Sequence, residues 1–299
     1  NAFTIAISNA DDTGSSAANL NTINDATSVA VDATQITSIA SSPITAINTL
    51  LAAAAATPPE ITNLSNLTEL VISDTGTVNA NTINTIVTNA DAVNGAGNTA
   101  VNINSATGVT GTEAHFDTLL TNEDNSLVTN LTDQALSVTG GTITAAKANT
   151  ISGTTTGVTT AEITDTQPLT ALVGLNFTGA GSTPNAYTIT IATADAVVAD
   201  AANLNTVDAR TSVPVIANAV TQLTGTASAL NTLYGAATSG TVTGLDASET
   251  TILSDTSLSA ATLHTLKNTM DTLADSVSAT DPSPNSSSSI DRIKADALD

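Results

Sequence analysis

The sequence lacks cysteine and tryptophan and is poor in aromatic residues. The absence of cysteine excludes disulfides, cysteine-ligated zinc and thiol catalysis. Aromatic residues make up only 2% of the 299 residues, whereas large rings usually fill the irregular spaces of a compact core. We therefore expect a core of Ala, Val, Ile, Leu and Thr, which favours thin, regular layers.

Basic residues are also scarce, with 5 Lys and Arg against 27 Asp and Glu and a net charge of −22. This imbalance argues against nucleic-acid partners and against binding to anionic membranes. No apolar run approaches the ~20 residues that cross a bilayer, so no membrane insertion is expected. The sequence starts at Asn1 and shows no signal peptide, so we expect a processed form or a segment of a longer protein.

One stretch occurs twice in the chain. Residues 17–31 read AANLNTINDATSVAV, and residues 201–215 read AANLNTVDARTSVPV. The ungapped match covers residues 2–31 and 186–215, with sixteen of thirty positions identical. The duplication predicts one complete long unit and most of a second.

The expected segments follow from this duplication and from composition. They are a first long unit at 1–178, a junction with Gly and Pro at 179–185, a partial second copy at 186–278, a Ser/Pro linker at 279–289, and a short helix at 290–299.

A shorter element recurs as GTVNANTINTI (76–86), GTITAAKANTI (141–151) and SLSAATLHTL (257–266). Asn79, Thr144 and Ser259 share one position in it, and all three are good helix N-caps. Each copy is expected to be a strand, a sharp turn and a capped short helix. The longest helix is expected over 260–278, where apolar residues recur at three- and four-residue spacing.

Further N-caps follow the same pattern. They are Ser16, Asp200, Ser42 before Pro43, its counterpart Thr226, and Thr110 with Glu113 as a capping box. Strands are expected at FTIAI, SVAV, ELVIS, AVNI, ALSV, YTITI, SVPV and TILS. Because strands and short helices alternate, we expect parallel pairing through crossovers. The sequence thus predicts an elongated α/β repeat solenoid, β-solenoid-like, of short strands and short N-capped helices.

No group of residues indicates catalysis. His115 and His264 fall on separate expected helices, and neither has a metal-ligand residue at i+4, so both are expected to be ordinary helix-surface residues. Serine-nucleophile, phosphate-loop and dinucleotide motifs are absent. We expect no catalytic residue, no cofactor and no enzyme activity.

Acidic residues at expected turns are the candidate metal ligands, because calcium binds six to eight oxygens from carboxylates, carbonyls and amides. The candidates are Asp11, Asp12, Asp74, Glu123, Asp124 and Asp255. Asx-turns and helix caps explain the same residues without a metal. The compact calcium-binding signatures are absent.

The strings LNTL, TVNANTINTI, ALNTLYGAATSGTVTGLDASE and SDTSLSAATLHTL resemble the tandem repeats of very large bacterial surface proteins, which are prominent in cyanobacteria and other aquatic bacteria. The resemblance covers roughly 17–93 and 201–275 well, and 94–185 less well. It implies secretion, a cell-surface or extracellular role and further copies of the repeat. It brings no catalytic residues.

The sequence therefore predicts a structural protein that associates with itself in an extracellular filament, a surface layer or an adhesin stalk. Cell-surface polysaccharide is a further possible partner. One alternative is a viral fibre or glycan-binding adhesin module, which a surface patch with Tyr187, Tyr234 or Phe177 would favour. The other is a solenoid polysaccharide-degrading enzyme with two paired carboxylates.

Overall fold

The computed structural model describes residues 2–8, 15–64, 66–95, 97, 99–177, 184–191, 198–278 and 293–295. They form two compact units, residues 1–141 with 154–157 and residues 142–153 with 158–299. The expected linker at 279–289 and most of the junction at 179–185 lie outside the described residues. The division near residue 141 rests on spatial contacts and is separate from the sequence duplication.

The first unit alternates short strands with helices. Its helices are α1 (Ala17–Asp25), α2 (Ile44–Ala55), α3 (Ala80–Asn94) and α4 (Glu113–Asp124). Its strands are β1 (Val31–Asp32), β2 (Ser38–Ser42), β3 (Ile61–Thr62), β4 (Glu69–Ile72), β5 (Gly76–Asn79), β6 (Ala100–Asn102), β7 (Ala106–Gly111) and β8 (Val128–Thr129), followed by β9 (Ala135–Ile143).

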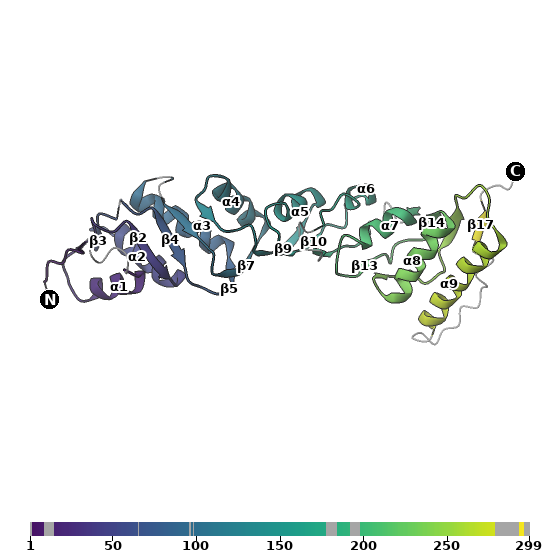
Figure 1. The fold of residues 1–299 in the computed structure, drawn as a ribbon, viewed down its shortest axis with the longest axis horizontal. Helices are drawn as coiled ribbons and strands as arrows, with labels where there is room; N and C mark the ends of the chain where they lie inside the picture. Colours follow the sequence, from purple (N-terminus) through teal and green to yellow (C-terminus); the bar gives the residue numbers. More distant parts are fainter. Residues whose placement is uncertain are drawn as a thin grey trace. The chain divides into compact units, whose positions relative to one another are not determined.

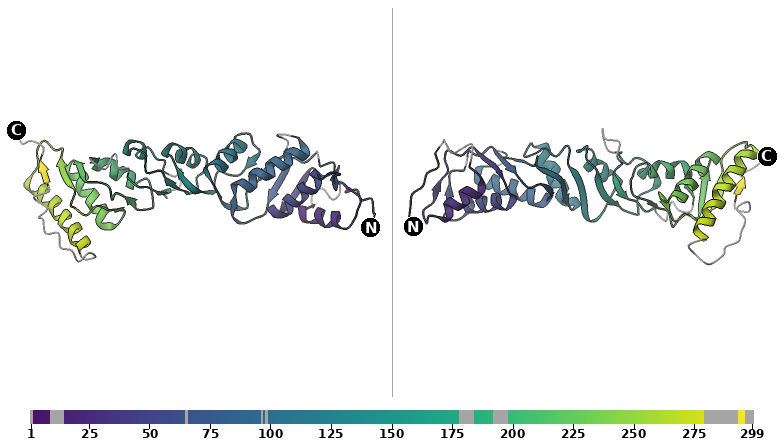
Figure 2. Two further views of the ribbon diagram at one scale, coloured as in Figure 1. Left: turned by 180° about the vertical axis from the view of Figure 1, so that it is seen from behind. Right: turned by 60° about the horizontal axis from the view of Figure 1, so that its bottom comes forward.

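These strands pair in parallel, since a helix or a long connection returns the chain before each new strand. One sheet has the order β2-β4-β6-β8, and β1 pairs with β3 in a smaller sheet. The helices pack in chain order, α1 on α2, α2 on α3 and α3 on α4. Figures 1 and 2 show α2 and α3 side by side.

The second unit is built in the same way. Its helices are α5 (Ala145–Ser152), α6 (Leu169–Leu172), α7 (Ala201–Asp208), α8 (Ala227–Ser239) and α9 (Ala260–Ser278). Its strands are β10 (Thr159–Ile163), β11 (Ala186–Thr188), β12 (Ala199–Asp200), β13 (Val215–Ile216), β14 (Gln222–Gly225), β15 (Val242–Thr243), β16 (Thr250–Leu253) and β17 (Ile293–Ala295). A parallel sheet has the order β12-β14-β16-β17, and β13 pairs with β15. Helix α7 packs on α8, and α8 on α9.

The predicted solenoid is wrong. The described residues form an α/β protein with several parallel sheets, among them two four-stranded sheets and a five-stranded sheet of order β11-β10-β9-β7-β5. The reason is the length of the crossovers, which hold helices of 12 residues in α2, 15 in α3 and 19 in α9. Helices of this length pack on one another and on the strands as a layer of their own, so the fold consists of Rossmann-like α/β layers.

Parallel pairing and the alternation of strands with helices are confirmed. The strand pairing also reveals a structural repeat whose period is much shorter than the length of the duplicated unit. Val31 pairs with Ile61, and Val101 pairs with Val128. In the second unit Val215 pairs with Val242 at the same sequence separation as Val101 and Val128. We call each such strand-and-helix segment a βα unit.

Most of the predicted helix starts are confirmed. Six predicted N-cap side chains accept a backbone N–H in the first turn of their helix: Ser16, Asn79, Thr144, Asp200, Thr226 and Ser259. The bounds of α9 match the predicted helix over 260–278. The predicted sharp turn before α3 is absent, because β5 ends at Asn79 and α3 begins at Ala80.

Three local predictions are wrong. The capping box of α4 joins Thr112 to His115, two residues beyond the predicted pair, because β7 continues through Thr110 and the helix starts at Glu113. Ser42 does not cap α2, since its hydroxyl bonds elsewhere. Within the predicted short helix at 290–299 the described residues 293–295 form strand β17 instead, because backbone pairing with β16 holds them extended; the rest of that range lies outside the described residues.

Candidate functional site

Six of the described helices, α1, α2, α3, α5, α7 and α8, share one positional pattern, whose positions we number N1, N2 and so on from the first helical residue. A small or apolar residue at N1 and a buried apolar residue at N4 are followed by Asn at N5 and Thr at N6. In α1 these are Ala17, Leu20, Asn21 and Thr22. The pattern recurs as Ile47-Asn48-Thr49, Ile83-Asn84-Thr85, Ala148-Asn149-Thr150, Leu204-Asn205-Thr206 and Leu230-Asn231-Thr232.

The N5 asparagine connects its helix to the next one. The side-chain Nδ2 of Asn84 donates to the carbonyl of His115, the N3 residue of α4, at 3.0 Å. Its Oδ1 accepts from Nδ2 of Asn122 on the same helix, at 3.1 Å. Asn84 is 7% exposed, so these bonds replace water that the amide has lost.

The same bond is made at two other places. Asn21 of α1 donates to the carbonyl of Ala46 in α2, and Asn205 of α7 donates to that of Ala229 in α8, both at 2.9 Å. In both cases the acceptor is again the N3 residue of the following helix. The bond thus recurs at the same position after α1, α3 and α7, three of the six helices that carry the N5 asparagine.

A second contact reaches back from the following βα unit to the start of the helix. The N1 backbone N–H has no partner inside its own helix, and in four helices a side chain 22 to 30 residues further on accepts it. The pairs are Ala17 with Ser42 Oγ (3.0 Å), Ile44 with Asp74 Oδ2 (2.7 Å), Ala145 with Gln167 Oε1 (3.2 Å), and Ala227 with Asp255 Oδ2 (2.7 Å). We call this contact the forward cap. We use the term interlock for the forward cap and the N5 bond taken together.

Two of the candidate calcium ligands form forward caps in the structure. Asp74 and Asp255 each place a carboxylate at the positive end of a helix, where a negative charge is stabilising. Glu123 and Asp124 are the last two residues of α4, and Asp11 and Asp12 lie outside the described residues. Within the ranges given above, no three His, Cys, Asp or Glu side chains gather as a metal site. The four described candidates, Asp74, Glu123, Asp124 and Asp255, are therefore not part of such a group.

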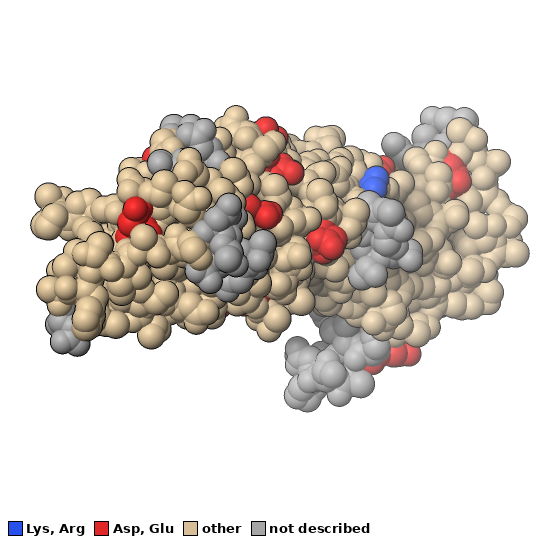
Figure 3. Space-filling view, turned by 60° about the vertical axis from the view of Figure 1, so that its left-hand side comes forward, with Lys and Arg blue, Asp and Glu red and all other residues tan. Residues whose placement is uncertain are grey.

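Two further carboxylates have shifted pKa values. The amide of Asn63 and the hydroxyl and N–H of Thr34 all donate to Asp32, which lowers the pKa of that carboxyl. Burial raises the pKa of Asp208, although a hydrogen bond from Thr241 opposes the shift. Figure 3 shows acidic side chains as separate spots among uncharged ones on the face drawn. Asp32 belongs to the first compact unit and Asp208 to the second.

The tyrosines do not form a surface platform for sugars. Tyr187 and Tyr234 are both 0% exposed, whereas Phe177 is 40% exposed. The hydroxyl of Tyr187 accepts from Asn185 at 2.9 Å, and burial raises its pKa. The hydroxyl of Tyr234 bonds Thr251 at 2.8 Å. Both rings therefore fill the core, and the aromatic patch that would favour glycan binding is not assembled around them.

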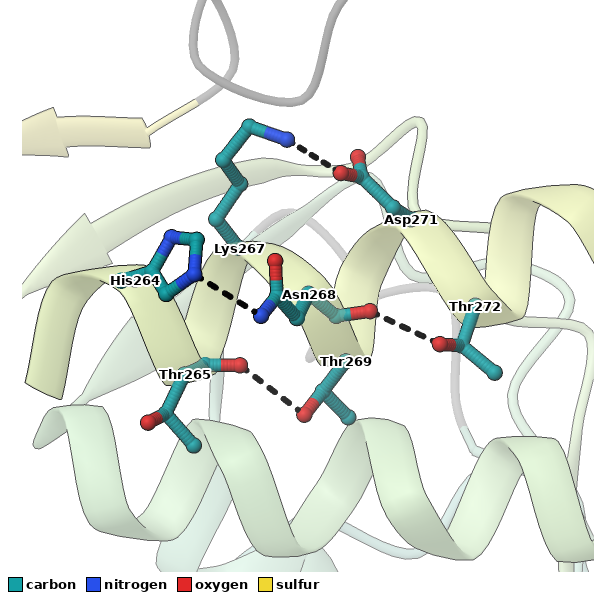
Figure 4. A network of polar contacts seen from close by, with 7 residues as sticks. All are labelled: His264, Thr265, Lys267, Asn268, Thr269, Asp271 and Thr272. Carbon is teal, nitrogen blue, oxygen red and sulfur yellow. Dashed lines mark hydrogen bonds and ion pairs between the residues drawn. The ribbon is translucent and has the colours of Figure 1, made fainter. Parts of the chain in front are cut away.

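Shallow grooves run between neighbouring helices. One of about 280 Å³ lies between α3 and α4 and is lined by neutral polar residues such as Asn81, Thr88 and Thr118. Another of about 450 Å³ lies between α8 and α9, where Thr265, Thr269 and Thr272 face Gly235, Thr238 and Ser239. Most of the threonine hydroxyls in these grooves donate to a carbonyl four residues back in their own helix, as Thr269 does to Thr265 (Figure 4). These two grooves offer hydroxyl and amide groups, and neither is lined by Asp, Glu, Lys or Arg. A third groove, between α1 and α2, is lined by the carboxylates Asp25 and Glu60.

One of the two histidines, His115, is not the ordinary helix-surface residue that we expected. His115 belongs to the α4 capping box, where its Nδ1 accepts the Thr112 N–H at 3.4 Å, and its carbonyl is the N5 acceptor described above. His264 occupies the N5 position of α9, and its Nε2 lies 3.2 Å from Nδ2 of Asn268 (Figure 4). Lys267 and Asp271 form an ion pair on the same helix. His115 is thus a structural residue of the interlock, which its sequence context did not indicate.

Comparison with protein families, with curated proteins and with solved structures finds no match for this chain. No helix among the described residues is long and apolar enough to cross a membrane. What the structure defines is an α/β protein of tandem βα units, in which polar side chains join six of the described helices, α1, α2, α3, α5, α7 and α8, to the next unit.

Proposed function

We propose that this chain is a structural, non-catalytic protein that associates with itself in an extracellular filament, a surface layer or an adhesin stalk. The observation that carries the proposal is the interlock. Several polar side chains that could do chemistry instead form hydrogen bonds between βα units, among them Asp74, Asp255 and Asn84.

The interlock supports a mechanical role because its hydrogen bonds join consecutive βα units, one after another along the chain. A net hydrogen bond contributes about 0.5–1.5 kcal/mol, and one to a charged group about 1.5–3 kcal/mol. A helix N–H or an asparagine amide that lost its partner inside the protein would cost about 1–3 kcal/mol. Separating one βα unit from the next therefore breaks side-chain bonds as well as the strand pairing and the apolar contacts.

The composition supports a role outside the cell. Without cysteine the chain is indifferent to the redox state of its surroundings, and with a net charge of −22 its surface stays hydrated in bulk solution. Like charges on neighbouring copies repel one another, so an assembly of this chain needs uncharged contact surfaces or bridging cations. Divalent cations are a possible component of the assembly, and cell-surface polysaccharide is a possible attachment partner.

Electron microscopy of the purified chain tests the proposal. Over rising protein concentration we expect ordered fibres or sheets by negative stain, together with a rising mass by light scattering. A parallel sample with a chelator, and a third with calcium restored, measures whether cations bridge the copies. Particles that stay monomeric at the highest concentration, with and without calcium, contradict the proposal.

A further inference from the structure

The sequence contains a motif that the contacts between βα units do not explain. The tripeptide N-x-S/T is the acceptor of N-glycosylation, and it begins at Asn63, Asn66, Asn130, Asn176 and Asn285. In a chain this rich in Asn, Ser and Thr the tripeptide alone is weak evidence, so its structural setting decides. All three residues are described in two cases, Asn66-Leu67-Thr68 and Asn130-Leu131-Thr132.

Both of these tripeptides lie in turns between strands. Asn66 stands between β3 and β4, and Asn130 between β8 and β9. In each tripeptide the asparagine and the threonine are exposed, whereas the leucine between them is 0–1% exposed. The leucine holds the turn on the core, so the acceptor amide and the hydroxyl two residues further on are both at the surface. A glycosyltransferase can therefore reach both groups.

The hydrogen bonds of the two amides are compatible with the modification. Glycosylation replaces one of the two hydrogens on the side-chain Nδ2 and leaves the other. Nδ2 of Asn66 donates to the carbonyl of Thr34 at 3.0 Å, and Nδ2 of Asn130 donates to Oδ1 of Asn102 at 2.8 Å. Each amide thus uses one hydrogen, and its bond can persist after a glycan is attached.

Asn176 shows the opposite case. It is half-buried, and its Nδ2 donates to the carbonyl of Asn149 at 3.1 Å and to Oγ of Ser152 at 3.2 Å. A glycan on this nitrogen would break one of the two bonds, and a lost hydrogen bond inside the protein costs about 1–3 kcal/mol. Asn176 is therefore a structural asparagine, and the inference excludes it.

The long duplication shows that the fold does not require the tripeptide at Asn66. Residues 61–72 correspond to residues 242–253, as β3 and β4 correspond to β15 and β16. In the second copy Ala247 takes the place of Asn66, and Glu249 takes that of Thr68. Both strands form there all the same. The asparagine and the threonine of the first copy are thus not needed to build this turn.

From these observations we infer that Asn66 and Asn130 are N-glycosylated by transfer of a glycan from a glycosyl phosphate donor. A bond forms between Nδ2 and the anomeric carbon of the donor, and the bond from that carbon to the phosphate oxygen breaks. The phosphate leaves with the electron pair, and the amide proton is released. The inference rests on the extracellular location in the proposed function, because this motif is modified on surface loops of secreted proteins.

The modification has a consequence for assembly. An N-glycan is a bulky, solubilising group at the surface. Attached at Asn66 and Asn130, it would cover two turns of the first compact unit. Contacts between copies would then have to use other surfaces of the chain.

Peptide mass spectrometry of the chain from its native source tests the inference. We expect glycan on Asn66 and Asn130 in most molecules. Asn104 is the internal control, since it is also an exposed turn residue but is followed by Ser105 and Ala106, without a hydroxyl at the second position; it should carry none. A preassembled oligosaccharide at both sites indicates a lipid-linked donor, and a single sugar indicates a sugar nucleotide; either supports the inference.

Variants at the threonines test whether the motif directs the modification. Thr68→Ala and Thr132→Ala remove the hydroxyl and leave each asparagine in place, so each should lower the mass of the intact chain by one glycan. Thr68→Ser and Thr132→Ser are the matched controls, because serine also completes the motif, and they should keep the glycan. All four positions of change are exposed, so the thermal midpoint should stay close to that of the wild type.

The outcomes separate the inference from the proposed function. If the native chain forms fibres or sheets with Asn66 and Asn130 unmodified, the inference is overturned and the structural role stands. The inference is also overturned if Asn104 is modified as often, or if the alanine variants keep their glycans. If the chain is glycosylated at both sites but stays monomeric, self-association falls and the inference stands.

Discussion

Removal of the Asp255 carboxylate should destabilise the second compact unit, because this carboxylate caps the first residue of α8, a helix that comes before Asp255 in the chain. Asp255 Oδ2 accepts the N–H of Ala227 at 2.7 Å, and Ala227 is the N1 residue of α8. A substitution Asp255→Ala leaves that N–H without its acceptor at a half-buried place. It also removes a negative charge from the positive end of the helix dipole.

The expected magnitude follows from these two losses. A hydrogen bond to a charged group contributes about 1.5–3 kcal/mol, and a charge near a helix terminus about 0.3–1 kcal/mol. Because Asp255 is half-buried and water can replace part of the bond, we expect Asp255→Ala to lower the free energy of unfolding by about 1–3 kcal/mol. Asp255→Asn keeps an acceptor oxygen but not the charge, so its loss should be smaller.

Urea unfolding and amide hydrogen exchange measure this effect. The exchange of the Ala227 N–H should quicken more than that of amides elsewhere in the unit, because local opening then needs no side-chain bond to break. Asp275→Ala is the matched control: Asp275 is exposed on α9, and a surface change of this kind stays within about 0.5 kcal/mol. Equal stability of the two alanine variants, or unchanged exchange at Ala227, would refute the forward cap as a stabilising contact.

Three further predictions concern packing, backbone and charge. Asn84→Ala should lower the free energy of unfolding by about 1–3 kcal/mol, because the N5 bond to the next helix is lost; urea unfolding checks it. Gly244→Ala should cost about 2–5 kcal/mol, since Gly244 has φ +88° and an added Cβ would lie 2.5 Å from a backbone nitrogen. Gly235→Ala, with nothing within 4 Å of the new Cβ, should instead gain about 0.5–1 kcal/mol in the interior of α8, by calorimetry. Burial raises the pKa of Asp208 above its unfolded value. The contribution of Asp208 to folding stability is therefore fully present below the unfolded pKa and is lost as pH rises through the folded pKa. Asp208→Asn should therefore raise stability at pH 7, and the gain should vanish in thermal scans near about pH 3.

The local structure could be predicted from the sequence where one residue determines it. A serine, threonine, asparagine or aspartate before a helical run is such a signal, and Ser16, Thr144 and Asp200 all cap their helices. Ser42 is the exception that shows the limit. Its hydroxyl accepts from the N–H of Ala17, in the preceding βα unit, and a short-range pattern contains no information about that partner.

The arrangement of the elements was predictable only in part. Alternating strands and helices do indicate parallel pairing, but they do not decide between a coil of stacked turns and layered sheets. The strands that were missed, such as β3 and β15, have two residues each, too few to show alternation. They pair with β1 and β13, each on the far side of an intervening helix, and so depend on tertiary contacts.

The interlock explains why the short period is hidden in the sequence. The forward cap needs only an oxygen at one point in space, and the chain supplies it from Ser42, Asp74, Gln167 or Asp255. Since a hydroxyl, a carboxylate and an amide all serve, neighbouring βα units need not share sequence there. The two aspartates occur in the same string, SDT at 73–75 and 254–256, because they are corresponding residues of the long duplication. The repeat that is visible in the sequence thus records a duplication, whereas the contacts that hold the chain together recur from one βα unit to the next and share their geometry more than their residue types.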